Sequence, residues 1–111
     1  MLEQEARISR GKDYSQIYKK GRRLAGKYLI IFVCPNQLPR NRFGIVTSKK
    51  VGNAVVRNRA KRQLRSIIRK NADRLPPGND VVVVARYNIK EAIFAVLEKD
   101  FLRLLKKAVL L

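Results

Sequence analysis

A run of basic residues between positions 47 and 70 constrains the fold of this chain more than any other feature of its sequence. The run carries nine lysine and arginine residues and no carboxylate. Its apolar residues recur with the 3.6-residue period of an α-helix, at Val56, Ala60, Leu64 and Ile67. Such a helix docks its apolar stripe on a core and keeps an almost wholly cationic face turned away. Cations four residues apart repel each other by about 0.2–0.5 kcal/mol per pair. Because no Glu or Asp relieves that repulsion, the pattern favours a polyanionic partner.

The charge of the whole chain supports the same interpretation. Among 111 residues, 26 Lys and Arg stand against 8 Asp and Glu, for a formal net charge of +18. Self-repulsion on that scale opposes compaction, so an anionic partner is the simplest explanation. At 46% hydrophobic residues, the chain is expected to fold rather than to form a disordered basic tail. Its length fits one domain over residues 1–111. Nucleic acid is the first candidate partner and an anionic membrane surface is the second.

Several kinds of chemistry are excluded by composition. The chain has no histidine and one cysteine, which rules out histidine acid–base catalysis, a Cys/His zinc site and an internal disulfide. Cys34 lies in an apolar run and is expected to be a small core residue. The carboxylates are few and scattered, whereas a protein nuclease needs them clustered to hold Mg²⁺. We therefore expect no catalysis by the polypeptide alone. No signal peptide or membrane-spanning run is recognisable, so we expect a cytoplasmic protein.

The first half of the chain predicts a helix followed by strands. Residues 1–12 are expected to be a loosely ordered lead-in that is partly held by Ile8. Asp13 is the expected N-cap of a short helix over 14–20. Strands are predicted at 22–25, 28–34 and 42–48, the third returning antiparallel to the second through a proline-containing loop.

The second half predicts the basic helix, one more strand and a closing helix. Asn53 is placed to cap the basic helix, which is expected to fade near Asp73 before a Pro-Pro-Gly break. Residues 81–85 form an apolar strand, and a last helix is predicted over 89–109. Its core residues recur at helical spacing, and they are Ile93, Leu97, Phe101, Leu104, Leu105 and Ala108. The fold class is therefore α+β, an α/β sandwich of order α-β-β-β-α-β-α with about four strands.

The short first helix carries two aromatic rings on one face. Tyr14, Ile17 and Tyr18 recur at i, i+3 and i+4. One interpretation is that the rings pack on the domain. The other is that a ring face stays open for a nucleic-acid base, a stacking contact that contributes about 1–3 kcal/mol per base. The residues alone leave both interpretations open.

The centre of the basic run matches a known motif. Residues 57–62 spell Arg-Asn-Arg-Ala-Lys-Arg, Arg65 follows, and Ser-Lys-Lys-Val-Gly-Asn-Ala precedes them at 48–54. This pattern closely resembles the signature of the bacterial ribonuclease P protein subunit. The likeness extends to residues 14–21, 28–33 and 81–86 and to the closing helix, nearly the whole domain in the family's order. A motif of this kind is far more specific than a generic arginine-rich helix.

The resemblance implies a protein cofactor of an RNA enzyme that removes the 5′ leader from precursor tRNA. In this family the helix with the motif and the loop before it lie against the catalytic RNA. A cleft between the first helix and one face of the sheet takes the single-stranded leader. By this likeness the residues expected to contact catalytic RNA are Lys49, Lys50, Asn53, Arg57, Asn58, Arg59, Lys61, Arg62, Arg65 and Arg69. Those expected to contact the leader are Tyr14, Tyr18, Phe32 and Ser48, with tyrosine where the family's first helix commonly has phenylalanine.

The same resemblance sets further expectations about cofactor, partners and topology. Mg²⁺ would be bound mainly by the RNA, with an auxiliary ion near Asn58 left open. One protein monomer would bind one catalytic RNA and the precursor tRNA leader, with no role for DNA or membrane. The family fold joins two parallel strands through the basic helix with a left-handed crossover, against the usual right-handed rule.

Two other classes of protein share some of these features. A structural RNA-binding protein of ribosomal type would have the same charge and size. It would not need aromatic rings that converge on single-stranded RNA. A DNA-binding or membrane-surface module is the third class. Against it, no helix-turn-helix pair or dimerisation heptad precedes the basic helix, and that helix lacks the Trp, Phe and Leu anchors of an interfacial helix.

Overall fold

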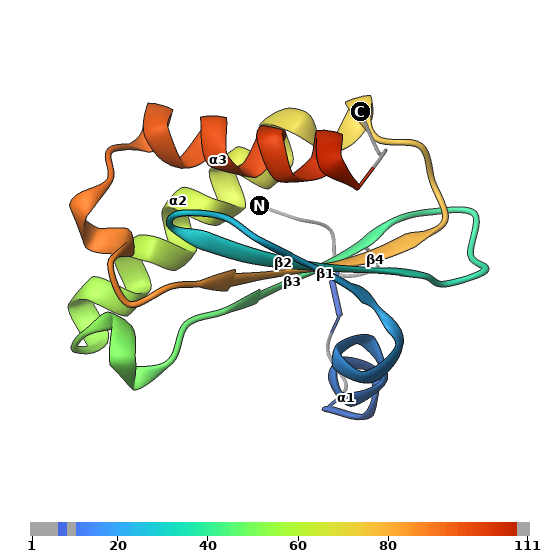
Figure 1. Cartoon of the computed structure of the whole chain (residues 1–111), viewed down its shortest axis with the longest axis horizontal. Helices are drawn as coiled ribbons and strands as arrows, with labels where there is room; N and C mark the ends of the chain where they lie inside the picture. Colours follow the sequence, from blue (N-terminus) through green and yellow to red (C-terminus); the bar gives the residue numbers. More distant parts are fainter. Residues whose placement is uncertain (1–6, 9–10, 109–111) are drawn as a thin grey trace.

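The computed structural model describes residues 7–8 and 11–108, and Figure 1 shows their arrangement. In these residues three α-helices and four strands follow one another in the predicted order, with three short 3₁₀ turns between them. The elements in chain order are α1 (Gly11–Lys20), β1 (Arg22–Ala25), β2 (Leu29–Pro35), β3 (Arg42–Val46), η2 (Lys49–Val51), α2 (Ala54–Asn71), η3 (Ala72–Arg74), β4 (Asn79–Ala85), η4 (Ile89–Glu91) and α3 (Phe94–Lys107).

The molecule has three layers, seen edge-on in Figure 1. The helices α2 and α3 cover one face of the sheet, and α1 lies on the opposite face. The strand order is β1-β2-β4-β3, in which β4 pairs antiparallel with β2 and parallel with β3. The predicted α+β sandwich is thus confirmed. The basic helix α2 makes the crossover between the parallel strands β3 and β4, and the left hand of that crossover stays a prediction.

The third strand differs from its prediction in its partner. It runs antiparallel to β2, as expected, but it does not pair with β2, because β4 lies between them. The cause is the apolar run of β4, where Val81, Val82 and Val83 are fully buried. A strand buried on both faces takes a central place in a sheet, so β3 is left at the edge and ends at Val46.

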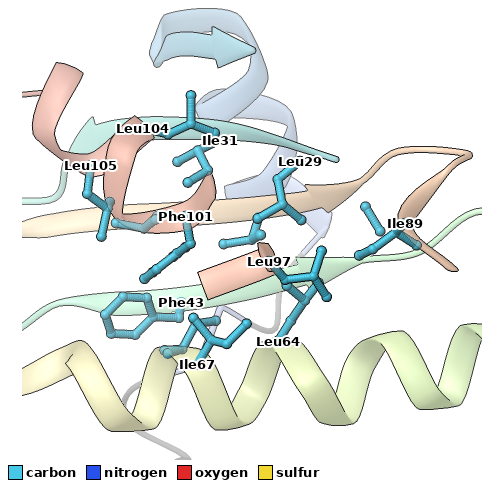
Figure 2. Close-up of a cluster of buried hydrophobic side chains, with 14 of the residues drawn as sticks. Leu29, Ile31, Phe43, Leu64, Ile67, Ile89, Leu97, Phe101, Leu104 and Leu105 are labelled. Atoms are coloured by element: carbon cyan, nitrogen blue, oxygen red, sulfur yellow. The ribbon is translucent and has the colours of Figure 1, made fainter. Parts of the chain in front are cut away.

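The main core lies between the sheet and the helices α2 and α3. Leu64 and Ile67 of α2 face Leu97 and Phe101 of α3, as Figure 2 shows. Both predicted helical stripes are confirmed apart from one residue. Ile93 is 69% exposed, because the chain turns at η4 before α3 starts at Phe94, which leaves Ile93 outside the helix. Position 109, the predicted end of the last helix, lies outside the described residues.

The lead-in is held to the domain at Ile8, as predicted, but the first helix starts earlier than predicted. Ile8 is buried and donates its backbone N–H to the Phe43 carbonyl at 2.9 Å. Helix α1 starts at Gly11, so Asp13 stands in its first turn and is not the N-cap. There it forms an ion pair with Arg42 at 3.5 Å. Cys34, predicted as a core residue, is half-buried and packs on the α1 side of the sheet.

Within the described part of the chain, no helix combines the length and apolar character needed to cross a bilayer.

Candidate nucleic-acid interface

Two arginines of the motif, Arg57 and Arg59, project from opposite flanks of α2. At 100° per residue, Arg57 and Arg59 stand about 200° apart around the helix, with the buried Ala60 and Leu64 marking the inner side. Asn58 points outward between them and is exposed. Arg59 lies beside η4, where it lines a groove. The motif therefore presents side chains over a broad arc of the helix.

Most cations of α2 have no carboxylate partner among the residues that the structure describes. Of those cations, only Lys70 forms an ion pair within residues 7–8 and 11–108, with Glu98 at 3.1 Å. The cations of α2 without an ion pair there are Arg57, Arg59, Lys61, Arg62, Arg65 and Arg69. Arg57 and Lys61 are half-buried, and the rest are exposed. Such a surface can neutralise the phosphates of a nucleic acid, and that neutralisation releases the counterions condensed on them.

The loop before α2 is fixed by capping hydrogen bonds. Asn53 accepts the Val56 N–H through its side-chain oxygen at 3.0 Å, as predicted for an N-cap. Ser48 likewise accepts the Lys50 N–H at 3.3 Å at the start of η2. Gly52 has φ = 148°, a conformation that side-chain-bearing residues rarely adopt, and a Cβ there would lie 3.1 Å from Val56. Lys49 and Lys50 are exposed on η2, at the N-terminal end of the basic surface.

On the other side of the sheet, α1 leaves part of the strand surface open. A row of register partners, Ala25, Ile30, Val84 and Val46, crosses all four strands on that side. Ala25 is exposed and the other three are half-buried. The next row, which includes Phe32 and Val82, lies under α1. The open row therefore forms an apolar floor of partly exposed side chains beside α1, and we use the name cleft for this floor together with the side of α1 that borders it.

Three aromatic rings line the wall of the cleft. The ring centroids of Tyr14 and Tyr18 are 6.3 Å apart, and those of Tyr18 and Phe32 are 4.9 Å apart with an edge-to-face tilt. Tyr18 is 42% exposed, so its neighbours cover it only in part. Burial raises the pKa of the Tyr14 and Tyr18 phenols, and the two rings' proximity adds to the rise at Tyr14. Both phenols therefore stay neutral at physiological pH and do not repel a phosphate chain.

Close packing and ion pairs hold α1 against the sheet. The Tyr14 hydroxyl donates to the Ile8 carbonyl at 3.1 Å, and its ring sits over Gly44, where a Cβ would come within 2.9 Å of it. Arg42 donates two hydrogen bonds to the buried Asp80, at 2.9 and 2.7 Å, and reaches Asp13 of α1. The hydrogen bond to Asp80 is the main cause of a raised Arg42 pKa.

The structure also adds residues that the sequence did not identify. Arg23 is the register partner of Phe32, and because Leu24 faces the core, Arg23 faces the cleft side. It is exposed and places a cation next to the rings. The apolar floor was missed as well. Strand alternation could have indicated both, but only once the register between strands was known.

The predicted RNA-binding and leader-binding residues lie on two sides of the sheet. Tyr14, Tyr18 and Phe32 meet in the cleft, whereas Ser48 lies beyond the end of β3, where it caps η2. Around the edge strand β3 the two surfaces are joined, because Tyr14 and Lys61 line one cavity of about 170 Å³.

The side chains offer little to a divalent cation on their own. Among residues 7–8 and 11–108, no group of three or more His, Cys, Asp or Glu is placed to hold a metal ion. Asn58 shares its groove with Lys61, Arg62 and Arg65, which repel a cation. The residues near Asn58 thus do not fit Mg²⁺ without the negative charge of a nucleic acid.

Comparison with known proteins identifies one family throughout. The family model "Ribonuclease P" matches residues 2–109. A ribonuclease P protein component from Syntrophomonas wolfei is 46% identical over 108 residues, covering 97% of this chain and 91% of the relative. One from Alkaliphilus metalliredigens is 38% identical, covering 96% of each chain.

Solved structures show the same likeness. A mutant RNase P protein of Staphylococcus aureus superimposes with a TM-score of 0.90 at 31% identity, covering 96% of this chain and 91% of that chain. The RNase P protein of Thermotoga maritima gives a TM-score of 0.82 at 32% identity, covering 91% and 96%.

Proposed function

This chain belongs to the ribonuclease P protein family, and from that membership we propose that it binds the catalytic RNA through α2 and the 5′ leader of precursor tRNA in the cleft. As a ribonuclease P component it is an RNA-binding protein of tRNA processing. The finer proposal assigns the two surfaces to two different RNAs. In the cell, one protein monomer would serve one catalytic RNA in the cytoplasm.

The observation that carries the proposal is the difference between the two surfaces. The surface of α2 is cationic, with Asn58 and Arg62 exposed and no carboxylate paired to its arginines in the described residues. It suits the dense phosphates of a folded RNA. The cleft instead combines an apolar floor with the Tyr18 and Phe32 rings, which suits the unstacked bases of a single strand. A purely structural RNA-binding protein would need the first surface but not the second.

Catalysis is proposed to reside in the RNA partner. The described residues offer no clustered carboxylates for a metal-dependent nuclease site. Mg²⁺ would be held by RNA phosphates and would supply Lewis-acid activation of the scissile phosphate and of the attacking water. The contribution of this chain is to hold the leader in the cleft while α2 anchors the catalytic RNA. Cations at the cleft rim, such as Arg23, would attract the leader's phosphates.

The leader-binding half of the proposal is tested at Tyr18. We expect Tyr18→Ala to weaken the affinity of the holoenzyme for precursor tRNA about tenfold, the lower part of the ~1–3 kcal/mol range for one stacked base. The affinity for mature tRNA, which has no leader, should change little. Equilibrium binding of both tRNAs to the reconstituted holoenzyme measures the difference.

Tyr87→Ala is the matched control, because Tyr87 is 65% exposed and has no ring contact with the cleft aromatics. It should leave both affinities unchanged. Equal losses for precursor and mature tRNA in the Tyr18 variant would assign Tyr18 a packing role and count against a leader cleft.

A further inference from the structure

The surface of α2 contains one large apolar residue that packing does not explain. Val55 is 75% exposed, in the first turn of a helix whose apolar stripe is otherwise turned inward. It lies between two hollows. One is a cationic groove that it shares with Asn58, Arg62 and Arg65. The other is an apolar groove between α2 and η4, which it shares with Ile89 and Ala92.

The apolar groove is small and lies beside side chains that can donate hydrogen bonds. Its volume is about 110 Å³, larger than the ~30 Å³ share of one water molecule but below the ~300–1,000 Å³ of pockets for drug-sized ligands. Its walls are Val55, Val56 and Ala60 of α2 together with Ile89 and Ala92. Arg59, Gln63 and Lys90 also line it, and no carboxylate does. A flat, uncharged ring with polar edges, attached to an anionic chain, matches this lining.

The two hollows are spaced like the parts of one nucleotide. On a helix, residues three and four apart are surface neighbours, with Cβ atoms about 5–6 Å apart. Val55 has this relation to Asn58 and to Arg59, and Arg62 has it to both of them. A phosphate held in the cationic groove therefore lies within the reach of one nucleotide from the apolar groove. The cationic groove complements the negative charge of a phosphate, and Val55 lines both hollows. Both features favour RNA over a protein segment as the occupant.

We propose that the groove between α2 and η4 takes an unpaired base of the catalytic RNA, packed against Val55, while the adjoining phosphate lies in the groove with Asn58 and Arg62. This deepens the proposed function and rests on α2 being the surface for the catalytic RNA. A base in the groove adds an apolar contact to the phosphate contacts of α2. This contact requires the nucleotide to be turned out of the RNA stack, and it does not depend on charge. It also extends the RNA footprint from α2 to Lys90 and η4.

Two substitutions separate the base from the phosphate. Val55→Thr keeps the shape and the β-branch but replaces a methyl group by a hydroxyl. The protein's affinity for an in-vitro-transcribed bacterial ribonuclease P RNA should fall about fourfold, the equivalent of one methyl group that is no longer buried. The slope of log K against log salt should not change. Arg62→Ala should reduce the magnitude of that slope by about 0.7–0.9, because a phosphate contact is lost.

Val96→Thr is the matched control, since it makes the same chemical change at an exposed position of α3 that does not line the groove. It should leave the affinity unchanged. Thermal unfolding of the free protein should be the same for the Val55 variant and the wild type. Unchanged affinity in Val55→Thr, or a loss that its unfolding temperature mirrors, would overturn the base site. Failure of Arg62→Ala to alter binding or slope would instead overturn the RNA surface on α2.

Crosslinking identifies the occupant directly. With p-benzoylphenylalanine at position 55, irradiation of the complex with the catalytic RNA should attach the protein to one unpaired nucleotide, read as a single reverse-transcription stop. Crosslinks between two protein chains would mean that the groove is a protein-binding surface. Crosslinks spread over paired regions would mean that Val55 lies against the RNA backbone. Either result contradicts the proposal.

Discussion

Replacing Arg57 and Arg59 together by alanine should lower the protein's affinity for ribonuclease P RNA about a hundredfold, at roughly 1.5 kcal/mol for each charged hydrogen bond lost. The two side chains leave α2 on opposite flanks and so contact different parts of the RNA. A single remaining contact therefore cannot replace both. The magnitude of the salt slope should fall by about 0.7–0.9 for each phosphate contact removed. Electrophoretic or filter binding at several salt concentrations measures both quantities.

The fold should tolerate the double substitution. Neither arginine has an ion-pair partner in the described part of the chain, and surface changes of this kind usually alter stability by less than about 0.5 kcal/mol. Lys106→Ala with Lys107→Ala is the control, because it removes the same charge from exposed positions in the last turn of α3. If both double variants lose equal affinity, binding reflects net charge alone and the motif has no special role.

Asp100→Ala should destabilise the fold by about 3 kcal/mol, because buried N–H groups without an acceptor cost about 1–3 kcal/mol each. Asp100 is 7% exposed on α3. One carboxylate oxygen accepts the backbone N–H groups of Tyr28 and Leu29, at 3.0 and 3.2 Å, and the other accepts from Arg103 at 2.9 Å. The carboxylate thus holds the turn between β1 and β2 against α3. Urea unfolding at constant salt measures the loss.

Asp73→Ala is the control for Asp100, since Asp73 is exposed on η3 and forms no ion pair within the described residues. It should change the free energy of unfolding by less than about 0.5 kcal/mol. Asp100→Asn, which keeps one acceptor oxygen, should fall between the two. A loss below about 1 kcal/mol in Asp100→Ala would mean that water replaces the carboxylate, and that the β1–β2 turn has another anchor.

Local patterns predicted the helices and strands well, because their causes lie within a few residues. The stripe from Val56 to Ile67 and the cap at Asn53 depend only on helical period and on one side-chain hydrogen bond. The prediction failed at Ile93, where the spacing continues across a turn that the sequence does not reveal. It also failed at Asp13 of α1, which pairs with Arg42 of the strand β3 and so serves tertiary packing rather than capping.

The candidate site was predictable only in part. The basic surface of α2 followed from the sequence because a helix sets its own faces. The apolar floor of the cleft did not, since Ile30, Val84 and Val46 become neighbours only through the insertion of β4 between β2 and β3. The groove beside Val55 depends in the same way on the docking of η4 against α2.

The central claim, that this chain is a working ribonuclease P cofactor, is tested most directly by cleavage of precursor tRNA at low Mg²⁺. A bacterial ribonuclease P RNA would be assayed with the wild-type protein, with the Arg57/Arg59 double alanine variant and without protein. We expect strong stimulation by the wild type and its loss in the variant. No stimulation by the wild type, together with tight binding to unrelated structured RNA, would contradict this account and favour a structural RNA-binding protein of ribosomal type.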